Sequence, residues 1–296
     1  MRSAIVIGST GFLGSAVTRR LLSNGIDVYA TKNKREIRLE QGLTVIDGGI
    51  RALTTAVLDR ISPEVIFHCA RPVLPRFRRW GRVMAAFHAK QYNRALLSQI
   101  TASRAKPALI FASGSLVYGN SVLPHDETAA LNPVSYARQY HRGEGPVLEA
   151  IPKENQKVIM LRFPWLLGDG SWFSWFYLKP LREKMLVPLF GDGSNMMSVI
   201  GLEIAAKTMV EYYNENIQSG VYNVIAPHVL TQRSFAETVA GHYGGMVTDY
   251  RNLYPEGVES AVLEAFTSNI LLATIHRVSP AKSPQSLNRL LSQIPL

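Results

Sequence analysis

The stretch Ser3-Ala-Ile-Val-Ile-Gly-Ser-Thr-Gly-Phe-Leu-Gly14 decides how the rest of the sequence is interpreted. Residues 4–7 form a short apolar run rich in β-branched side chains, which is typical of a buried parallel strand. Gly8, Gly11 and Gly14 follow at intervals of three, and apolar residues then recur at helical spacing. A strand that turns directly into a helix presents backbone N–H groups at the helix N-terminus, and these groups suit a pyrophosphate.

Glycine fits this turn because a Cβ would hold phosphate groups away or clash with the neighbouring strand. The sequence therefore predicts a dinucleotide-binding turn made by Gly8, Ser9, Thr10, Gly11, Phe12, Leu13 and Gly14. The spacing is G-x-x-G-x-x-G rather than G-x-G-x-x-G. The alternative is an ordinary tight strand–helix turn in another α/β fold.

Further strands and helices alternate along the first half of the chain. Strands are expected at 28–31, 43–46, 65–68 and 109–112, and helices at 52–60 and 80–103. This order predicts an α/β protein, a Rossmann-type doubly wound parallel sheet with a smaller C-terminal substrate-binding lobe. We expect a first domain at 1–168, rejoined by a strand near 221–226, and a mainly helical lobe at 169–296. Helices in that lobe are predicted at 173–184, 202–216, 231–243 and 258–275.

The second strand ends in basic residues. Lys32, Lys34 and Arg35 precede Glu36, which is the first acidic residue after this strand. In dinucleotide folds an acidic group here binds the ribose 2′-OH of NAD, whereas a basic group accommodates the 2′-phosphate of NADP. Lys32 and Arg35 therefore favour NADP over NAD, and the alternative is a solvated basic loop.

Several ordered motifs resemble the extended short-chain dehydrogenase/reductases, also described as the NAD-dependent epimerase/dehydratase family. They span roughly residues 1–240 and include the glycine turn, Ser113-Gly-Ser-Leu-Val-Tyr-Gly119, Ser135-Tyr-Ala-Arg-Gln-Tyr140 followed by Glu144, Leu161-Arg-Phe-Pro-Trp-Leu-Leu-Gly168, and Pro188-Leu-Phe-Gly-Asp-Gly193. The resemblance implies further coenzyme contacts at Ala70, Arg71, Ala112, Tyr136, Tyr140, Phe163 and Pro164. It also implies a homodimer formed through the helices at 80–103 and 135–150.

The resemblance fails at the residue pair that transfers protons in this family. A Tyr-x-x-x-Lys pair is expected, with the lysine lowering the tyrosine pKa and holding the coenzyme ribose. Tyr136 matches the tyrosine, but Tyr140 stands where the lysine is expected. A phenol with a pKa of about 10 is a poor base at neutral pH unless a cation lies near it. Tyr140 can still donate to a ribose hydroxyl.

A cation from elsewhere in the chain could replace the missing lysine. Five arginines follow the fourth strand, at positions 71, 76, 78, 79 and 82, in a loop at the carboxyl ends of the strands. Ligands bind at this edge of parallel sheets. Arg71 is the nearest candidate, and the alternative for all five is a solvated surface.

A serine or threonine that holds the substrate oxygen is implied at Gly114. Ser115 is the preferred substitute and Ser113 the second choice, with a plain turn serine as the alternative. The predicted catalytic set is therefore Tyr136, Ser115, Ser113 and Tyr140.

Two features point away from a nucleotide-sugar substrate. Met196 and Met197 occupy the place where the sugar-nucleotide members carry a diphosphate-gripping arginine. Trp172, Phe173, Trp175, Phe176 and Tyr177 form a dense aromatic cluster, which either builds core or lines an apolar pocket. We expect a small substrate, hydrophobic or anionic.

The bulk composition narrows the remaining possibilities. The net charge is +10, yet no nucleic-acid motif is present, so we expect no nucleic-acid partner. No apolar run reaches membrane length and no signal peptide is recognised, so we expect no membrane partner. The single cysteine, Cys69, is read as a small buried hydrophobe and favours a reducing, cytoplasmic location. The histidines show no metal-ligand spacing, and we predict no metal site. His68 is expected in the core and His125 in a surface loop that could approach a substrate.

Three functions remain open. The first is an NADP-dependent oxidoreductase in which Tyr136 moves the proton. The second is an isomerase, epimerase, dehydratase or cyclase without net redox change. The third is a non-catalytic NADP-binding sensor or scaffold, favoured by the absent lysine.

Overall fold

The computed structural model describes residues 1–33, 37, 41–71, 78–215, 217–276 and 286–296. Within them the chain divides into two compact units. Unit 1 consists of Met1–Ser113, Arg138–Arg162 and Ala205–Tyr222, and unit 2 of Gly114–Ala137, Phe163–Ile204 and Asn223–Leu296. The two units interleave in the sequence.

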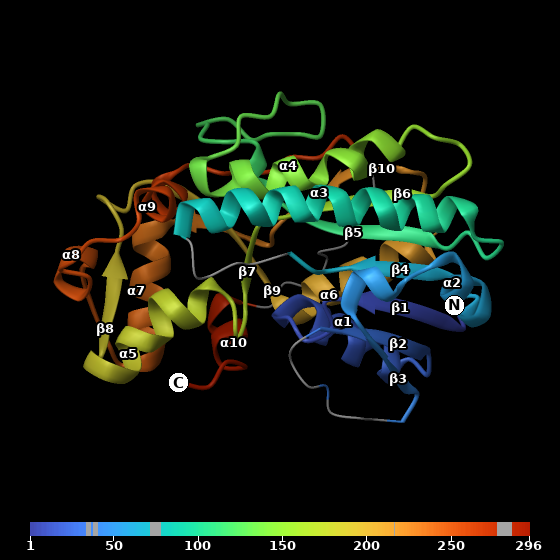
Figure 1. Ribbon diagram of the computed structural model, residues 1–296. Helices are drawn as coiled ribbons and strands as arrows, with labels where there is room; N and C mark the ends of the chain where they lie inside the picture. Colours follow the sequence, from blue (N-terminus) through green and yellow to red (C-terminus); the bar gives the residue numbers. More distant parts are fainter. Residues whose placement is uncertain (34–36, 38–40, 72–77, 216, 277–285) are drawn as a thin grey trace. The chain divides into compact units, whose positions relative to one another are not determined.

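A seven-stranded sheet forms the centre of unit 1 (Figure 1), in the order β10-β6-β5-β4-β1-β2-β3. The central pairs, β1 with β2 and β4, β2 with β3, and β4 with β5, are parallel. Ile5 at the centre of β1 pairs with Tyr29 on one side and Ile66 on the other. The strands are β1 (Ser3–Ile7), β2 (Asp27–Lys32), β3 (Leu43–Asp47), β4 (Val65–His68), β5 (Ala108–Gly114), β6 (Val158–Phe163) and β10 (Gly220–Asn223).

Helices flank this sheet, as expected for parallel strands joined by crossover connections. They are α1 (Phe12–Ser23), a short 3₁₀ helix η1 (Gly49–Ala52), α2 (Thr55–Ile61), α3 (Arg78–Ala102), α4 (Ser135–Ala150) and α6 (Leu202–Asn214). Alternate strand residues face opposite sides. Ile5 and Ile66 pack with Leu97 of α3 and Val147 of α4 in one buried cluster.

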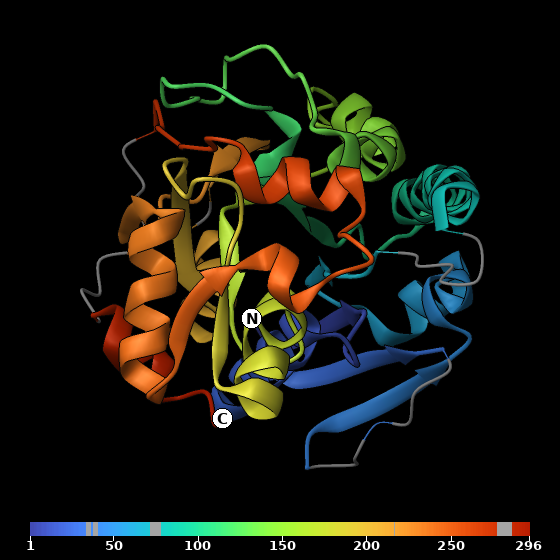
Figure 2. The ribbon, with the colours of Figure 1, turned by 90° about the vertical axis from the view of Figure 1, so that its left-hand side faces the viewer.

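Helices α3 and α4 pack unusually closely. They lie side by side in both views (Figures 1 and 2). The Asn93 side chain of α3 donates to the Gly143 carbonyl of α4 over 2.9 Å. A Cβ at Gly143 would lie 2.7 Å from the Ala89 side chain. Glycine at 143 therefore permits this close contact, which fixes α4 along unit 1.

Unit 2 contains smaller sheets and short helices. The antiparallel pair β9–β11 is joined by β7, and β8 pairs with β12. The elements are η3 (Ser115–Val117), β7 (Trp165–Leu167), a π-helix η4 (Ser174–Leu178), α5 (Lys179–Lys184), β8 (Leu186–Leu189), β9 (Met196–Gly201), β11 (His228–Thr231), α7 (Gln232–Tyr243), β12 (Met246–Asp249), α8 (Tyr250–Leu253), α9 (Ser260–Thr267) and α10 (Leu287–Leu291).

The predicted helix at 258–275 is wrong in its second half. Helix α9 ends at Thr267, and the chain then runs extended. Ile270 N–H donates to the Met196 carbonyl, and residue 272 bridges to His125 in parallel. Backbone pairing with two distant segments outweighs the helical pattern, which sequence spacing could not reveal.

Candidate functional site

The glycine turn has the geometry that its spacing implies. Gly8 adopts a positive φ of 84°, and Gly11 N–H donates to the Gly8 carbonyl over 2.8 Å. A Cβ at Gly14 would collide with the Gly8 carbonyl oxygen. Helix α1 starts after Gly11 with no side-chain cap and no acidic residue in its first turn. Its N-terminal N–H groups and dipole therefore suit an anion.

The segment after β4 lies directly against this turn. Cys69 N–H donates to the Ile7 carbonyl over 2.9 Å, which extends the β1–β4 pairing beyond the strands. A Cβ at Gly8 would lie 2.8 Å from Ala70 N. Ala70 therefore packs on Gly8, and Arg71 emerges beside the glycine turn.

The predicted turn residues differ in what they can contact. Leu13 is buried in the core, so its side chain serves packing. The buried Ser9 hydroxyl donates to the Thr31 carbonyl over 3.0 Å and ties the turn to β2. Phe12 remains partly exposed at the start of α1.

At the end of β2, Lys32 lies 3.6 Å from Asp47 of β3 in an ion pair. The Lys32 ammonium therefore already has a carboxylate partner on the neighbouring strand. Arg35, the second residue assigned to a 2′-phosphate, lies outside the described residues.

Helix α4 carries Tyr136 and Tyr140 one turn apart, so both lie on one helix face. Both are half-buried. The Arg71 guanidinium carbon lies 4.9 Å from the centre of the Tyr140 ring, within cation–π range. The side chain at the expected lysine position is thus a phenol with a cation on its face.

A buried carboxylate one turn further along α4 engages Ser113. The Ser113 hydroxyl donates to Glu144 Oε1 over 2.8 Å, and His141 Nδ1 lies 3.4 Å from Glu144 Oε2. Glu144 is 3 % exposed. The Ser113 proton is therefore committed to this carboxylate. The sequence analysis named Glu144 only as part of the helix motif. It did not predict that Glu144 binds Ser113, which the structure shows.

Unit 2 holds three further predicted site residues. Ser115 opens η3 and is 3 % exposed, while Phe163 and Pro164 are buried. Ala112, by contrast, lies on β5 in unit 1 and is half-buried.

A buried polar network in unit 2 was not predicted from the sequence. The Tyr118 hydroxyl donates to Asn223 Oδ1 over 2.8 Å, and Asn223 N–H donates to Glu127 over 2.8 Å. Glu127 also accepts from Thr274 Oγ1 and from the Ile275 N–H. Burial raises the pKa of Glu127, but these hydrogen bonds outweigh it and hold the pKa below its usual value. The network joins segment 120–127 to segment 269–276.

His125 belongs to this tied segment. Its ring stacks on Tyr118 with 5.1 Å between centroids, and its backbone N–H donates to the Leu271 carbonyl over 2.9 Å. The structure therefore gives His125 a packing role.

The aromatic cluster at 172–177 is mainly core. Phe173 and Tyr177 are fully buried in the core of unit 2, together with Phe235 and Phe266, whereas Trp175 is 66 % exposed. Met196 and Met197 stand at the place expected for the diphosphate-gripping arginine. Met196 is half-buried, and Met197 is 1 % exposed and belongs to the same core. That position therefore offers a phosphate no positive charge.

His68 is buried, as predicted, and its ring lies 4.7 Å from that of Phe111. Burial lowers the pKa of His68 to about 4. Burial raises the pKa of Cys69 to about 12, so this thiol is not a nucleophile at neutral pH.

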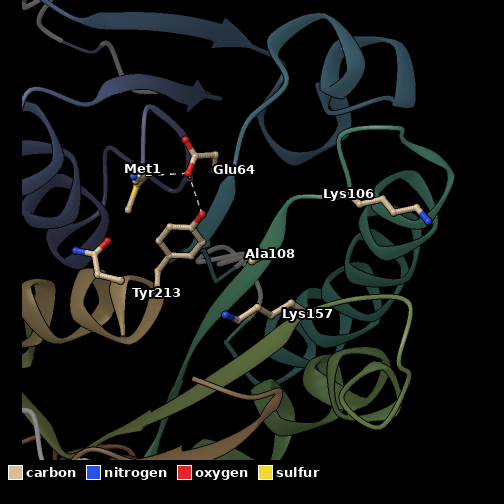
Figure 3. Close-up of a pocket in the computed structure, with 7 residues that line it drawn as sticks. Met1, Glu64, Lys106, Ala108, Lys157 and Tyr213 are labelled. Carbon is tan, nitrogen blue, oxygen red and sulfur yellow. Dashed lines mark hydrogen bonds and ion pairs between the residues drawn. The ribbon is translucent and has the colours of Figure 1, made fainter. Parts of the chain in front are cut away.

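A hollow lies at the amino-terminal edge of the unit 1 sheet, the edge opposite the glycine turn (Figure 3). It has a volume of about 460 Å³ and is lined by Met1, Glu64, Lys106, Ala108, Lys157, Tyr213 and Asn214. Glu64 accepts from the Tyr213 hydroxyl over 3.0 Å, and burial together with Glu64 raises the pKa of Tyr213 to about 12. Figure 3 shows the Lys106 side chain pointing away from this pair. Parallel sheets bind ligands at the other edge, so we do not assign the site here.

Among the described residues, no group of three or more histidine, cysteine, aspartate or glutamate side chains could hold a metal ion. In the same part of the chain, no helix has both the length and the apolar character needed to span a membrane.

The parallel sheet with flanking helices and a glycine turn after β1 defines a Rossmann-type α/β protein. The model of the NAD dependent epimerase/dehydratase family matches residues 4–224, and the chain belongs to this family. No curated protein matches the chain.

Solved structures of nucleotide-sugar enzymes share the fold. A dTDP-glucose 4,6-dehydratase from Streptomyces venezuelae with NAD bound is 16 % identical, with a TM-score of 0.76, and the match covers 99 % of this chain and 95 % of that one. The UDP-glucose 4-epimerase from Thermotoga maritima is 18 % identical (TM-score 0.73, coverage 91 % and 89 %). The Thermus thermophilus UDP-glucose 4-epimerase complex with NAD is 19 % identical (TM-score 0.68, coverage 84 % and 86 %).

Proposed function

We propose that this protein is an NAD(P)-dependent oxidoreductase acting on a small, partly apolar carbonyl or alcohol. The glycine turn carries the proposal, because Gly8 and Gly14 leave no room for a Cβ and α1 presents an uncapped N-terminus. The phosphates of the coenzyme would lie on residues 8–14, with Ala70, Arg71, Ala112, Phe163 and Pro164 as further contacts. A bound nicotinamide would supply the hydride transfer.

Side chains of the protein would carry out the proton transfer that accompanies hydride transfer. Tyr136 Oη gives a proton to the substrate oxygen in reduction and removes it in oxidation. Ser115 holds that oxygen by a hydrogen bond, while Ser113 is held by Glu144. Tyr140 lies on the same face of α4 and contributes a ring beneath Arg71.

Coenzyme binding is the first test. Titration of the purified protein with NADPH, NADH and their oxidised forms should quench its tryptophan fluorescence saturably. A folded protein that binds none of the four would overturn the proposal. We propose NADP as the preferred coenzyme because Lys32 ends β2 and Arg35 follows it in the sequence. The related structures contain NAD, so a tighter complex with NADH would reject this preference.

Catalysis is tested at Tyr136. Tyr136→Phe should lower turnover at least about a hundredfold, in line with the contribution of general acid–base catalysis, while the dissociation constant for the coenzyme stays within about twofold. An unchanged rate would remove Tyr136 from the mechanism.

The substrate proposal rests on Met196 and Met197, which stand where an arginine would bind a diphosphate. Neither side chain carries a positive charge, and this favours an apolar substrate over a diphosphate. A panel of apolar aldehydes, ketones and alcohols should therefore include better substrates than UDP-sugars or dTDP-sugars. Efficient turnover of a nucleotide sugar would reverse this assignment.

A second candidate function is epimerisation, dehydration or cyclisation without net redox change. The family of the chain and the named activities of the related structures favour it. Substrate consumption without a lasting change in NADPH absorbance would select it.

A third candidate, a non-catalytic sensor or scaffold, is favoured by Tyr140 in place of lysine. Tight coenzyme binding with no turnover across the same panels would select it.

We further propose a homodimer through α3 and α4, and a cytoplasmic location on the basis of the single cysteine.

A further inference from the structure

We infer that Arg71, seated on the ring of Tyr140, is a coenzyme-binding cation of this chain that contacts the phosphates or the ribose of the dinucleotide. Tyr140 is then a positioning residue that holds the guanidinium through its ring. The inference rests on the proposed dinucleotide site and concerns unit 1 alone.

Arg71 and Tyr140 form a cation–π pair. Arg71 is an exposed side chain on the segment after β4, whereas Tyr140 is half-buried on α4. Their 4.9 Å separation places the positive charge on the electron-rich face of the ring. A long arginine side chain loses conformational freedom when it binds a ligand, and a ring already fixed on a helix reduces that loss.

Arg71 follows directly after the residue that packs on the glycine turn. Ala70 packs on Gly8, with Ala70 N 2.8 Å from the position a Gly8 Cβ would take. Arg71 is the next residue, about 3.8 Å further along the backbone. The cation therefore originates beside the turn that would receive the pyrophosphate, at the carboxyl edge of the sheet.

The charges near the glycine turn favour an anionic ligand. The first turn of α1 contains no acidic residue, and Asp47 at the end of β3 is paired with Lys32. Arg71 thus adds a positive charge to a region already favourable for anions. The chain places a neutral ring at position 140 and takes its cation from the segment after β4.

The experiment compares dissociation constants for NADPH and NADH, measured by tryptophan fluorescence at low and moderate salt. Arg71→Ala should weaken binding by about tenfold to a hundredfold, the range for losing a charged hydrogen-bond donor. It should also reduce the salt dependence of binding. Arg94→Ala, which removes an exposed arginine from α3, is the matched control and should change neither quantity.

Two substitutions at Tyr140 separate its ring from its hydroxyl. Tyr140→Phe keeps the ring and should bind within about twofold of wild type, whereas Tyr140→Leu should bind about threefold or more weakly. In the Arg71→Ala background, Tyr140→Lys should restore part of the lost affinity. Thermal unfolding of each variant checks that the fold is retained.

The outcomes distinguish this inference from the proposed function. Wild-type binding with no loss in Arg71→Ala overturns the inference and leaves the dinucleotide site intact. Equal losses of coenzyme affinity in Tyr140→Phe and Tyr140→Leu would show that the Tyr140 hydroxyl is needed. That result would reject the ring as the group that holds Arg71. Failure of the wild-type protein to bind any dinucleotide overturns both.

Discussion

Single residues decide whether the glycine turn can form. Position 14 requires glycine because the Gly8 carbonyl oxygen occupies the space that a Cβ would need. A Cβ at Gly241, in the interior of α7, would point into open space. The two helical glycines therefore have opposite physical roles, one steric and one incidental.

This contrast gives a matched pair of substitutions. Gly14→Ala should destabilise the protein by about 1–3 kcal/mol, as overpacking does, and abolish coenzyme binding. Gly241→Ala should raise the free energy of unfolding by up to about 1 kcal/mol, because alanine favours helix. Chemical denaturation measures both, and a tolerated Gly14→Ala would contradict the steric explanation.

His68 gives a prediction for pH. Its folded pKa of about 4 lies below the usual value of 6.5, so the unfolded chain binds the proton more readily. The contribution of His68 to stability is therefore lost as pH falls from 6.5 to about 4. NMR should show the His68 ring resonances unchanged from pH 7 to pH 5 and shifting near pH 4. A midpoint near 6.5 would show that the ring is hydrated.

At the scale of elements, long segments without regular structure are held by side chains. Asn223 is fully buried and donates to the carbonyls of His125 and Ala273, over 3.0 Å and 2.9 Å. Glu127 holds the same two segments through Thr274 and Ile275. These contacts replace the helix that the sequence pattern predicts up to residue 275.

Removing the Glu127 charge should loosen this connection. Glu127→Gln should lower the free energy of unfolding at pH 7 by about 1–2 kcal/mol. Because the folded pKa of Glu127 is depressed, its contribution is present above pH 4.5 and is lost as pH falls through the folded pKa. The difference between wild type and variant should therefore shrink as pH falls below 4.5. A constant difference across pH would exclude a role for the charge.

Two neighbouring aromatic residues should respond differently to truncation. Phe173→Ala should destabilise by about 3–5 kcal/mol, because Phe173 is fully buried in the core of unit 2. Trp175→Ala should change stability by less than about 0.5 kcal/mol, because its side chain is largely exposed. Thermal unfolding distinguishes them, and equal losses would contradict the assignment of the cluster to the core.

At the scale of the whole molecule, the proposed homodimer depends on the outer surface of α3. Met84 and Phe87 are 47 % and 54 % exposed on this helix, one turn apart. Large apolar side chains exposed together favour an interface. The contact between α3 and α4 at Gly143 gives such an interface a rigid base.

Phe87→Glu should therefore convert a dimer into a folded monomer, with the dissociation constant raised about tenfold or more, because a buried charge at an interface is costly. Sedimentation velocity over a range of concentrations measures this. Trp175→Glu, on an exposed apolar residue of unit 2, is the control and should leave the oligomeric state unchanged. A monomeric wild-type protein would reject the homodimer.

The sequence by itself determined the Rossmann-type fold and the glycine turn, because strand and helix periodicity and the three glycines are local properties of the chain. It also placed His68 in the core and identified Tyr140 as the departure from the family pattern. Only the tertiary structure decided that Arg71 lies on Tyr140 and that Glu144 holds Ser113. Sequence alone could not decide these, because they depend on how β4, β5 and α4 are brought together by packing across large separations in the chain.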